Sequence, residues 1–225
     1  MTVPIIAICG IATDEGSWGS MPVDRIVVPR GTSIAAMVDE FLPKLPNRFA
    51  LCGHSMGGYV ALEIVARVPE RLAGLAMLSS GCTADSDEAR KGRQAAIAEA
   101  GHDYPALAHR LARAMLSRLS RADAELLAET RAMLMRCGAE RFSEQQAAAA
   151  TRMDRCDMLS MITVPALLLA GAEDRIVAPD RSREMAAALP DAVLHILPGC
   201  GHVPQREAPG ATRAALAAWR ERLAA

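Results

Sequence analysis

Three side chains that together could carry out nucleophilic catalysis each follow an apolar run in this chain. Ser55 lies in the segment Gly-His-Ser-Met-Gly after the run that begins at Phe49, Asp174 follows the run that begins at Ala166, and His202 follows the last such run. A serine hydroxyl is a poor nucleophile near neutral pH unless a base accepts its proton and a carboxylate orients that base. The sequence offers all three groups, in the order serine, aspartate, histidine.

The segment around Ser55 predicts a buried strand, a sharp turn and a helix. Apolar residues fill positions 49–52 before the turn and recur through positions 59–66 after it. Such a turn holds the serine hydroxyl at the carboxyl end of a sheet, above the N-terminus of the helix. Positions 53 and 57, both glycine, are expected to require a small residue because the strand and the helix nearly touch there. The Gly-x-Ser-x-Gly pattern is weak evidence alone, and the flanking strand and helix give it weight.

The rest of the chain alternates short apolar runs with helical patterns, which predicts a mostly parallel sheet with helices on both faces. Strands are expected at residues 5–9, 24–28, 49–52, 72–78, 166–170 and 192–197, and helices at 34–42, 56–68, 180–189 and 209–223. Since the carboxyl ends of parallel strands meet at one edge of a sheet, Ser55, Asp174 and His202 can converge there.

The strand pattern is interrupted between about residue 85 and residue 160. Apolar positions recur there at helical spacing, which predicts an insertion of about four helices. Asp85 precedes the first helix, Gly101 is expected to end it, and residues 120–123 and 143–146 resemble capping boxes. We therefore predict a core formed by residues 1–80 and 161–225 and an all-helical cap at residues 81–160.

Composition excludes several function classes. The 225 residues carry 25 basic and 26 acidic side chains, a net charge of −1, which favours neither nucleic acid nor a membrane surface as a partner. No apolar run approaches the ~20 residues of a membrane span. No metal-ligand pattern, phosphate-binding loop or dinucleotide fingerprint occurs, so neither a metal nor an organic cofactor is expected. The histidines His102, His109 and His195 suggest no metal site.

The six cysteines form no Cys-x-x-Cys pair, and the first residues lack a basic flank with a long apolar stretch. These features predict that the chain has no signal peptide and is cytoplasmic, with its thiols reduced. Cys82, at the start of the insertion, is expected either to line a pocket or to pack in the core.

The motifs resemble those of the α/β-hydrolase family. Residues 53–58 resemble its nucleophile elbow, residues 171–177 its acid loop, and residues 201–204 with Glu207 and Pro209 its histidine loop. The resemblance covers nearly all of the chain except the insertion, which occupies the usual position of the family's cap. It implies that Ser55 is the nucleophile, His202 the general base and then acid, and Asp174 the orienting acid. Glu173 and Asp180 remain rivals for the last role.

The resemblance also implies an oxyanion hole made of two backbone N–H groups. One belongs to Met56, directly after the nucleophile, and the other to Ile11, in the loop after the first strand. Family members commonly have a histidine where this chain has Cys9. The N–H donors are unaffected by that difference, but the loop loses the hydrogen bond with which the usual histidine would brace it. His54 is expected to support the elbow without reacting.

The expected function is that of a serine hydrolase acting on a small carboxylic ester or related acyl substrate. No charged anchor is evident in the insertion, which favours an apolar or weakly polar acyl group. Carbon–carbon bond hydrolases, thioesterases, lactonases and cofactor-free haloperoxidases share the same three residues, and the fold does not choose among them. A receptor that retains these residues but turns over slowly is a further alternative. The oligomeric state is not predicted.

Overall fold

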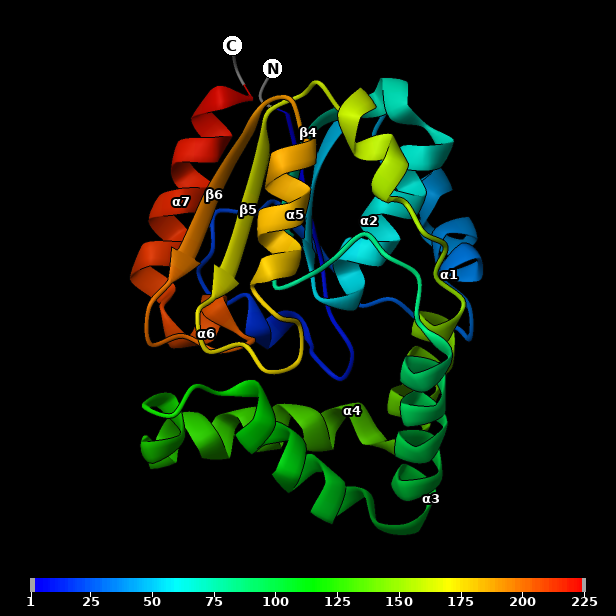
Figure 1. Cartoon of the computed structure of the whole chain (residues 1–225), viewed down its shortest axis with the longest axis vertical. Helices are drawn as coiled ribbons and strands as arrows, with labels where there is room; N and C mark the ends of the chain where they lie inside the picture. The colour runs from blue at the N-terminus through cyan, green and yellow to red at the C-terminus, as the bar shows by residue number, and fades with distance from the viewer. Residues whose placement is uncertain (1–2, 224–225) are drawn as a thin grey trace.

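A single six-stranded sheet forms the centre of the computed structural model, which describes residues 3–223 (Figure 1). Its strands are β1 (Ile5–Ile8), β2 (Arg25–Val27), β3 (Phe49–His54), β4 (Leu72–Leu78), β5 (Ala166–Gly171) and β6 (Ala192–Leu197). They lie in the order β2-β1-β3-β4-β5-β6, and every neighbouring pair is parallel. The predicted mostly parallel sheet is confirmed.

Helices cover both faces of the sheet because side chains along each strand alternate between two apolar layers. Ile6 and Ile8 pack with α1 (Ile34–Phe41), α2 (Met56–Arg67) and α5 (Asp180–Ala188), whereas Ile5 and Ala7 face α7 (Pro209–Arg222). Short helices complete the core: α6 (Pro204–Glu207) and the 3-10 turns η1 (Glu15–Ser17), η2 (Leu42–Lys44) and η3 (Pro69–Arg71). Strands β1, β3, β4 and β5 are buried on both faces, as continuous apolar runs predict, whereas the edge strands β2 and β6 are partly exposed.

The segment between β4 and β5 is helical. It contains α3 (Asp87–Met115), η4 (Ser120–Ala122), α4 (Ala124–Ala150) and η5 (Cys156–Met161), and Figure 1 shows α3 and α4 in green beyond the carboxyl ends of the strands. The backbone leaves helical geometry inside α3 at Asp103 and inside α4 at Gly138, where φ is 77°. Each long helix therefore consists of two helical segments.

Three predicted helix boundaries in this segment are wrong. The first segment of α3 ends at Asp103 instead of Gly101, because the carboxylate of Asp103 accepts a hydrogen bond from Ala106 N (3.0 Å) and caps the next segment. Asp123, the last residue of the predicted capping box 120–123, is instead the N-cap residue of α4, and its carboxylate accepts hydrogen bonds from the amides of residues 125 and 126. Residues 143–146 lie within α4 and start no helix.

A disulfide joins Cys82, just after β4, to Cys156, just after α4. The prediction that all thiols are reduced is therefore wrong for these two residues. Their Cα atoms lie 4.9 Å apart because the chain returns to its starting point after the two long helices. The pairing spans 74 positions, so a search for closely spaced cysteines could not find it. The other cysteines, at positions 9, 52, 137 and 200, are free and buried.

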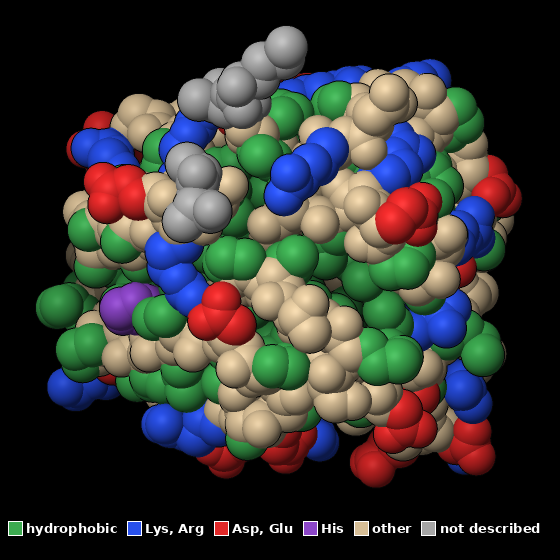
Figure 2. Space-filling model, turned by 90° about the horizontal axis from the view of Figure 1, so that it is seen from above, with side chains coloured by type: hydrophobic (Ala, Val, Ile, Leu, Met, Phe, Trp, Pro, Cys, Tyr) green, Lys and Arg blue, Asp and Glu red, His purple; other side chains and the backbone are tan. Residues whose placement is uncertain are grey.

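The face at the amino ends of the strands lies opposite α3 and α4. Figure 2 shows basic and acidic side chains of both signs dispersed over this face, with apolar side chains between them. No helix within residues 3–223 combines the length and apolar character needed to cross a bilayer. The opposite edge of the sheet, where the strands end beneath the helical insertion, holds the candidate site.

Candidate active site

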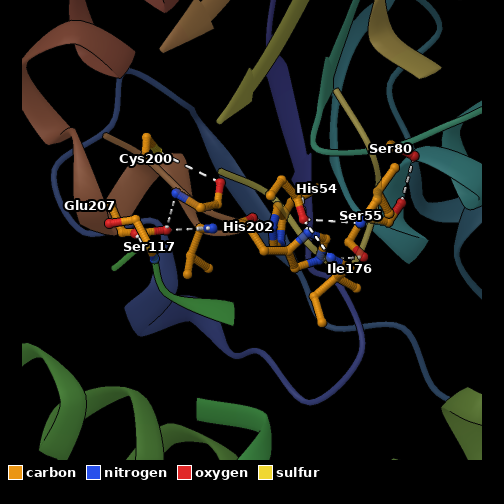
Figure 3. A network of polar contacts seen from close by, with 12 residues as sticks. His54, Ser55, Ser80, Ser117, Ile176, Cys200, His202 and Glu207 are labelled. Carbon is orange, nitrogen blue, oxygen red and sulfur yellow. Dashed lines mark hydrogen bonds and ion pairs between the residues drawn. The ribbon is translucent and has the colours of Figure 1, made fainter. Parts of the chain in front are cut away.

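The backbone of Ser55 has φ 52° and ψ −118°, a conformation that residues other than glycine rarely adopt. The turn between β3 and α2 is held in place by two hydrogen bonds: Ser55 N donates to Leu78 O (2.9 Å), and Ser80 Oγ donates to Ser55 O (2.8 Å; Figure 3). A positive φ at a residue other than glycine costs free energy and persists only where surrounding contacts enforce it. The turn thus places the hydroxyl at the start of α2.

The glycines on either side of Ser55 are required by close packing. A Cβ atom on Gly53 would lie 2.5 Å from the carbonyl oxygen of Gly57. A Cβ atom on Gly57 would lie 2.1 Å from the carbonyl oxygen of Ile8, in the neighbouring strand β1. The prediction that both must be small is confirmed, and the tightest contact is between α2 and β1.

The structure brings Ser55, His202 and Asp174 together, although 119 and 28 positions separate Asp174 from its two partners. His202 Nε2 lies 3.0 Å from Ser55 Oγ, and His202 Nδ1 lies 2.8 Å from Asp174 Oδ2. Asp174 follows β5 and His202 follows β6, so the sheet edge positions both. All three side chains are buried. With a neutral imidazole, Nδ1–H donates to the carboxylate and Nε2 accepts from the serine hydroxyl.

Asp174 is held as a carboxylate. Burial raises its pKa, but the charge of His202 and hydrogen bonds from His202 and from the amides of Val177 and Ile176 outweigh burial, so its pKa lies below the usual value. The two amides lie 3.0 and 2.8 Å from Oδ1. The rivals suggested by the sequence are engaged elsewhere: Glu173 accepts from Arg118 N, and Asp180 pairs with Arg183 at the surface.

The histidine loop is fixed from the helical insertion. His202 N donates to Met115 O (2.7 Å) at the end of α3. The carboxylate of Glu207 accepts from Gly201 N (3.0 Å) and Val203 N (3.2 Å), and from Ser117 N (2.7 Å) just after α3 (Figure 3). The position of the imidazole is therefore coupled to the end of α3, a link that the sequence pattern did not reveal.

His54 contacts both the backbone and the ring of His202. Its Nε2–H donates to the carbonyl oxygen of His202 (2.8 Å), and the two rings lie 5.1 Å apart between centroids. Burial and the neighbouring His202 lower the pKa of His54 to about 3. The ring is therefore neutral near pH 7 and acts as a hydrogen-bond donor, in line with the supporting position expected for it.

The depressed pKa of His54 predicts a pH dependence of stability. Unfolded histidine titrates at about 6.5 and folded His54 at about 3, so between these values only the unfolded state gains this proton. Stability then falls as the pH drops from 6.5 towards 3, with a contribution of up to ~1.4 kcal/mol per pH unit from this group. We expect His54→Asn to flatten the slope between pH 6 and pH 4, measured by urea denaturation. The exposed His195→Asn should retain the wild-type slope, and equal slopes in all three proteins would contradict the assignment.

The two expected oxyanion donors border the site. Met56 is the first residue of α2, directly after Ser55, and Ile11 lines the same cavity as Ser55. Within residues 3–223, the amide N–H of Ile11 donates no hydrogen bond to the protein. It is available to an oxygen in the cavity. The geometry is compatible with the roles expected for these amides.

Gln145, on α4, braces the loop that carries Ile11, and sequence reasoning missed it. Its Oε1 accepts from Ala12 N (2.8 Å), and its Nε2 donates to Pro29 O (3.0 Å). Ala12 has φ 57°, and the Gln145 side chain is completely buried. The insertion thus supplies the brace, and the loop after β1 receives it. In this loop Cys9 stands where the resembling family commonly has a histidine. A glutamine within a helix gives no sequence signal for such a role.

Loss of this brace should reduce turnover more than substrate affinity. Gln145→Leu removes both hydrogen bonds, leaving Ala12 N without a partner and the loop free to shift. We expect kcat for a simple ester to fall about 10- to 100-fold, less than the loss of a direct oxyanion donor, with KM changed only about twofold. The matched control is Glu144→Ala, at the preceding position. A variant with unchanged kcat and a normal melting temperature would contradict the bracing role.

Two other candidate nucleophiles near the site are protonated. Burial raises the pKa of Cys9 to about 12, and burial with the nearby carboxylates of Glu207 and Asp174 raises the pKa of Cys200 beyond its ordinary range. A thiol reacts as its thiolate. Neither cysteine therefore competes with Ser55 near neutral pH.

A cavity of about 410 Å³ lies between the sheet edge and the helical insertion. One part of its wall is apolar and is formed by Ile11, Leu111, Met115, Leu134, Phe142, Ile176 and Val177. Another part carries Asp85, Arg93, Gln146 and Arg152. The expectation that the insertion offers no charged anchor is wrong, because Arg93 lies in α3 and Arg152 just after α4. The volume suits a small organic ligand.

The sequence is similar to those of several known hydrolases. The model of the family Hydrolase_4, described as serine aminopeptidase, S33, matches residues 25–209. A pimeloyl-[acyl-carrier protein] methyl ester esterase of Aromatoleum aromaticum is 28% identical over 195 residues, which are 78% of this chain and 75% of that protein. A putative carbamate hydrolase RutD of Klebsiella pneumoniae is 29% identical over 186 residues, covering 78% of this chain and 68% of that protein.

Solved structures resemble this one over nearly its whole length. A thermophilic esterase from Thermogutta terrifontis, determined with malate bound, has a TM-score of 0.89 at 23% identity and covers 99% of this chain and 91% of its own. A putative non-heme bromoperoxidase BpoC from Mycobacterium tuberculosis has a TM-score of 0.80 at 20% identity, covering 100% and 94%. These similarities establish a common fold.

Proposed function

The chain belongs to the α/β-hydrolase family represented by the serine aminopeptidase S33 model, and on this premise we propose that it hydrolyses small carboxylic esters through an acyl-enzyme on Ser55. One observation carries the proposal: Ser55 Oγ lies 3.0 Å from His202 Nε2, and His202 Nδ1 lies 2.8 Å from Asp174 Oδ2. An alcohol, a base and an orienting carboxylate in hydrogen-bond contact are the groups that acyl transfer requires. The relatives named as ester hydrolases support this reaction class.

In the first half of the reaction, Ser55 Oγ attacks the ester carbonyl carbon while its proton passes to His202 Nε2. The carbonyl oxygen becomes negative, and the N–H groups of Ile11 and Met56 donate to it. The carbon–oxygen bond to the alcohol then breaks, and the alcohol leaves with the proton from His202. Asp174 stabilises the imidazolium and holds its orientation throughout.

In the second half, water replaces the alcohol. His202 accepts a proton from the water as its oxygen attacks the acyl carbon, and the same two amides hold the second oxyanion. The bond from the acyl carbon to Ser55 Oγ breaks, the proton returns to Oγ, and the carboxylic acid is released. Both halves use only the side chains and amides named above and a water molecule.

We assign residues 81–160 as the cap of the site and residues 1–80 and 161–225 as its core. The support is that α3 and α4 supply cavity residues such as Leu111 and Phe142, while Ser55 and His202 come from the core. The apolar part of the wall suits the hydrocarbon part of an acyl substrate. A cytoplasmic location stays a prediction. Disulfides such as Cys82–Cys156 are rare in cytosolic proteins.

A substrate panel tests the reaction class. Purified protein would be assayed with short and medium p-nitrophenyl esters, a thioester, a lactone and a 1,3-diketone at equal concentration. We expect kcat/KM to be highest for the esters, because the site has the parts for acyl transfer to water. Turnover of the diketone alone would reassign the protein to carbon–carbon bond hydrolysis, and no turnover of any compound would contradict the proposal.

A further inference from the structure

A buried charged cluster lies in the cavity wall and has no part in the mechanism above. Asp85 is its centre, with a side chain only 1% exposed. Arg93 Nε lies 2.5 Å from Asp85 Oδ2, and Arg152 Nη1 lies 2.5 Å from Asp85 Oδ1. Gln146 joins the cluster by accepting from Arg93 Nη1 at 2.7 Å. All four residues line the cavity that contains Ser55.

The cluster carries an excess of positive charge. Two guanidinium groups, 18% and 11% exposed, face one carboxylate, and among the described residues no other acidic side chain lines the cavity. A third cation, Arg181, lines the cavity as well and pairs with Glu184 at the surface. A buried charge without full compensation is costly, so such a wall favours an anion in the cavity.

The guanidinium group of Arg152 also retains an unused donor. Arg152 donates from Nε to Thr83 O (2.7 Å) and from Nη1 to Ala149 O (3.3 Å), and its Nη1 forms an ion pair with Asp85. Within residues 3–223, its Nη2 makes no hydrogen bond to a protein acceptor. A planar guanidinium with free N–H groups matches the two oxygens of a carboxylate better than it matches a neutral group.

Tyr59 connects this cluster to the nucleophile. It lies four residues after Ser55 at the start of α2, and both residues line the cavity. The guanidinium carbon of Arg152 lies 4.3 Å from the centroid of the Tyr59 ring. The cation is therefore stacked on a ring that lines the same cavity as Ser55.

We propose that Arg93 and Arg152 form a carboxylate-binding subsite, and that the substrate is an ester bearing a second, free carboxylate separated from the scissile bond by a short apolar chain. The inference rests on the proposed ester hydrolysis and names its substrate class. The apolar wall contacts the chain, and the cluster holds its charged end. This arrangement fixes which carbonyl group lies against Ser55.

Matched substrates test the subsite in the unmodified protein. The monomethyl esters of succinic, glutaric, adipic and pimelic acid would be compared with methyl esters of monocarboxylic acids of equal chain length. We expect kcat/KM to be at least about tenfold higher for the best monomethyl dicarboxylate, because its free carboxylate gains a charge-assisted hydrogen bond from the arginines. Equal values for every pair would overturn the subsite while leaving ester hydrolysis intact.

Variants locate the preference. Arg152→Gln and Arg93→Gln should lower the ratio of kcat/KM for carboxylated over neutral ester by about tenfold or more. The matched control is Arg90→Gln, one helical turn before Arg93 on α3, where the side chain is exposed and pairs with Asp87. A ratio that stays at the wild-type value in both cavity variants would overturn the assignment of these arginines.

Direct binding separates failure of the subsite from failure of the proposed reaction. Calorimetry with wild-type protein would compare butyrate with the neutral butyramide, without any turnover. Tighter binding of butyrate, lost at high salt and in Arg152→Gln, supports the subsite even if no ester is hydrolysed. Equal binding of the acid and the amide, together with hydrolysis of neutral esters, overturns the subsite alone.

Discussion

Replacing Ser55 by alanine is expected to lower kcat for a p-nitrophenyl ester by about ten-thousand- to a million-fold. The variant has no atom to form the acyl-enzyme, and the remaining oxyanion donors accelerate only the direct attack of water. Alanine removes one oxygen from a buried turn whose backbone hydrogen bonds to Leu78 and Ser80 do not use the side chain. The melting temperature should therefore change little, and KM should stay within a few-fold.

The measurement is a steady-state ester assay on matched preparations of the wild type and Ser55→Ala. Ser160→Ala, on the exposed surface, controls for the loss of a serine elsewhere. A residual rate within tenfold of the wild type would show that another group is the nucleophile. It would also remove the basis for every role assigned to His202 and Asp174.

Replacing Asp174 by asparagine is expected to lower kcat by about ten-thousand-fold. The amide keeps the shape of the side chain but can turn its NH₂ group towards His202 Nδ1, which favours the wrong tautomer and leaves no negative charge beside the imidazolium. The hydrogen bonds from Ile176 and Val177 remain possible to the amide oxygen, so the loop should keep its conformation. The loss is therefore expected in kcat and not in stability.

The control for this prediction is Asp180→Asn, because the sequence left Asp180 as a rival and the structure places it at the surface with Arg183. It should retain wild-type kcat. A loss smaller than tenfold in Asp174→Asn would mean that a different acid orients the histidine. A large loss in Asp180→Asn with none in Asp174→Asn would exchange the two roles.

The core of the fold could be predicted because its four central strands are buried on both faces. Strands β4 and β6 begin and end where the apolar runs do, and the turn at Ser55 follows from two glycines at fixed spacing. Asp174 and His202 could be identified because each follows such a run. In these segments the local pattern and the tertiary environment require the same residues.

The parts that could not be predicted depend on contacts between the insertion and the core. The Cys82–Cys156 disulfide forms only because two helices return the chain to its starting point. Gln145 braces the loop after β1 from a position 133 residues away from Ala12. Arg93 and Arg152 were not recognised as a charged anchor, since nothing local in the sequence indicates that helix packing turns them towards a cavity.

The most direct test of the account is labelling with a fluorophosphonate, followed by mass-spectrometric mapping of the modified residue. The reagent forms a covalent bond with a serine only where a base activates its hydroxyl, so it tests the nucleophile and its activation together. The account predicts stoichiometric modification of Ser55 in the wild type and little or none in His202→Asn. Modification of a different residue, or an unlabelled Ser55 in folded protein, would contradict it.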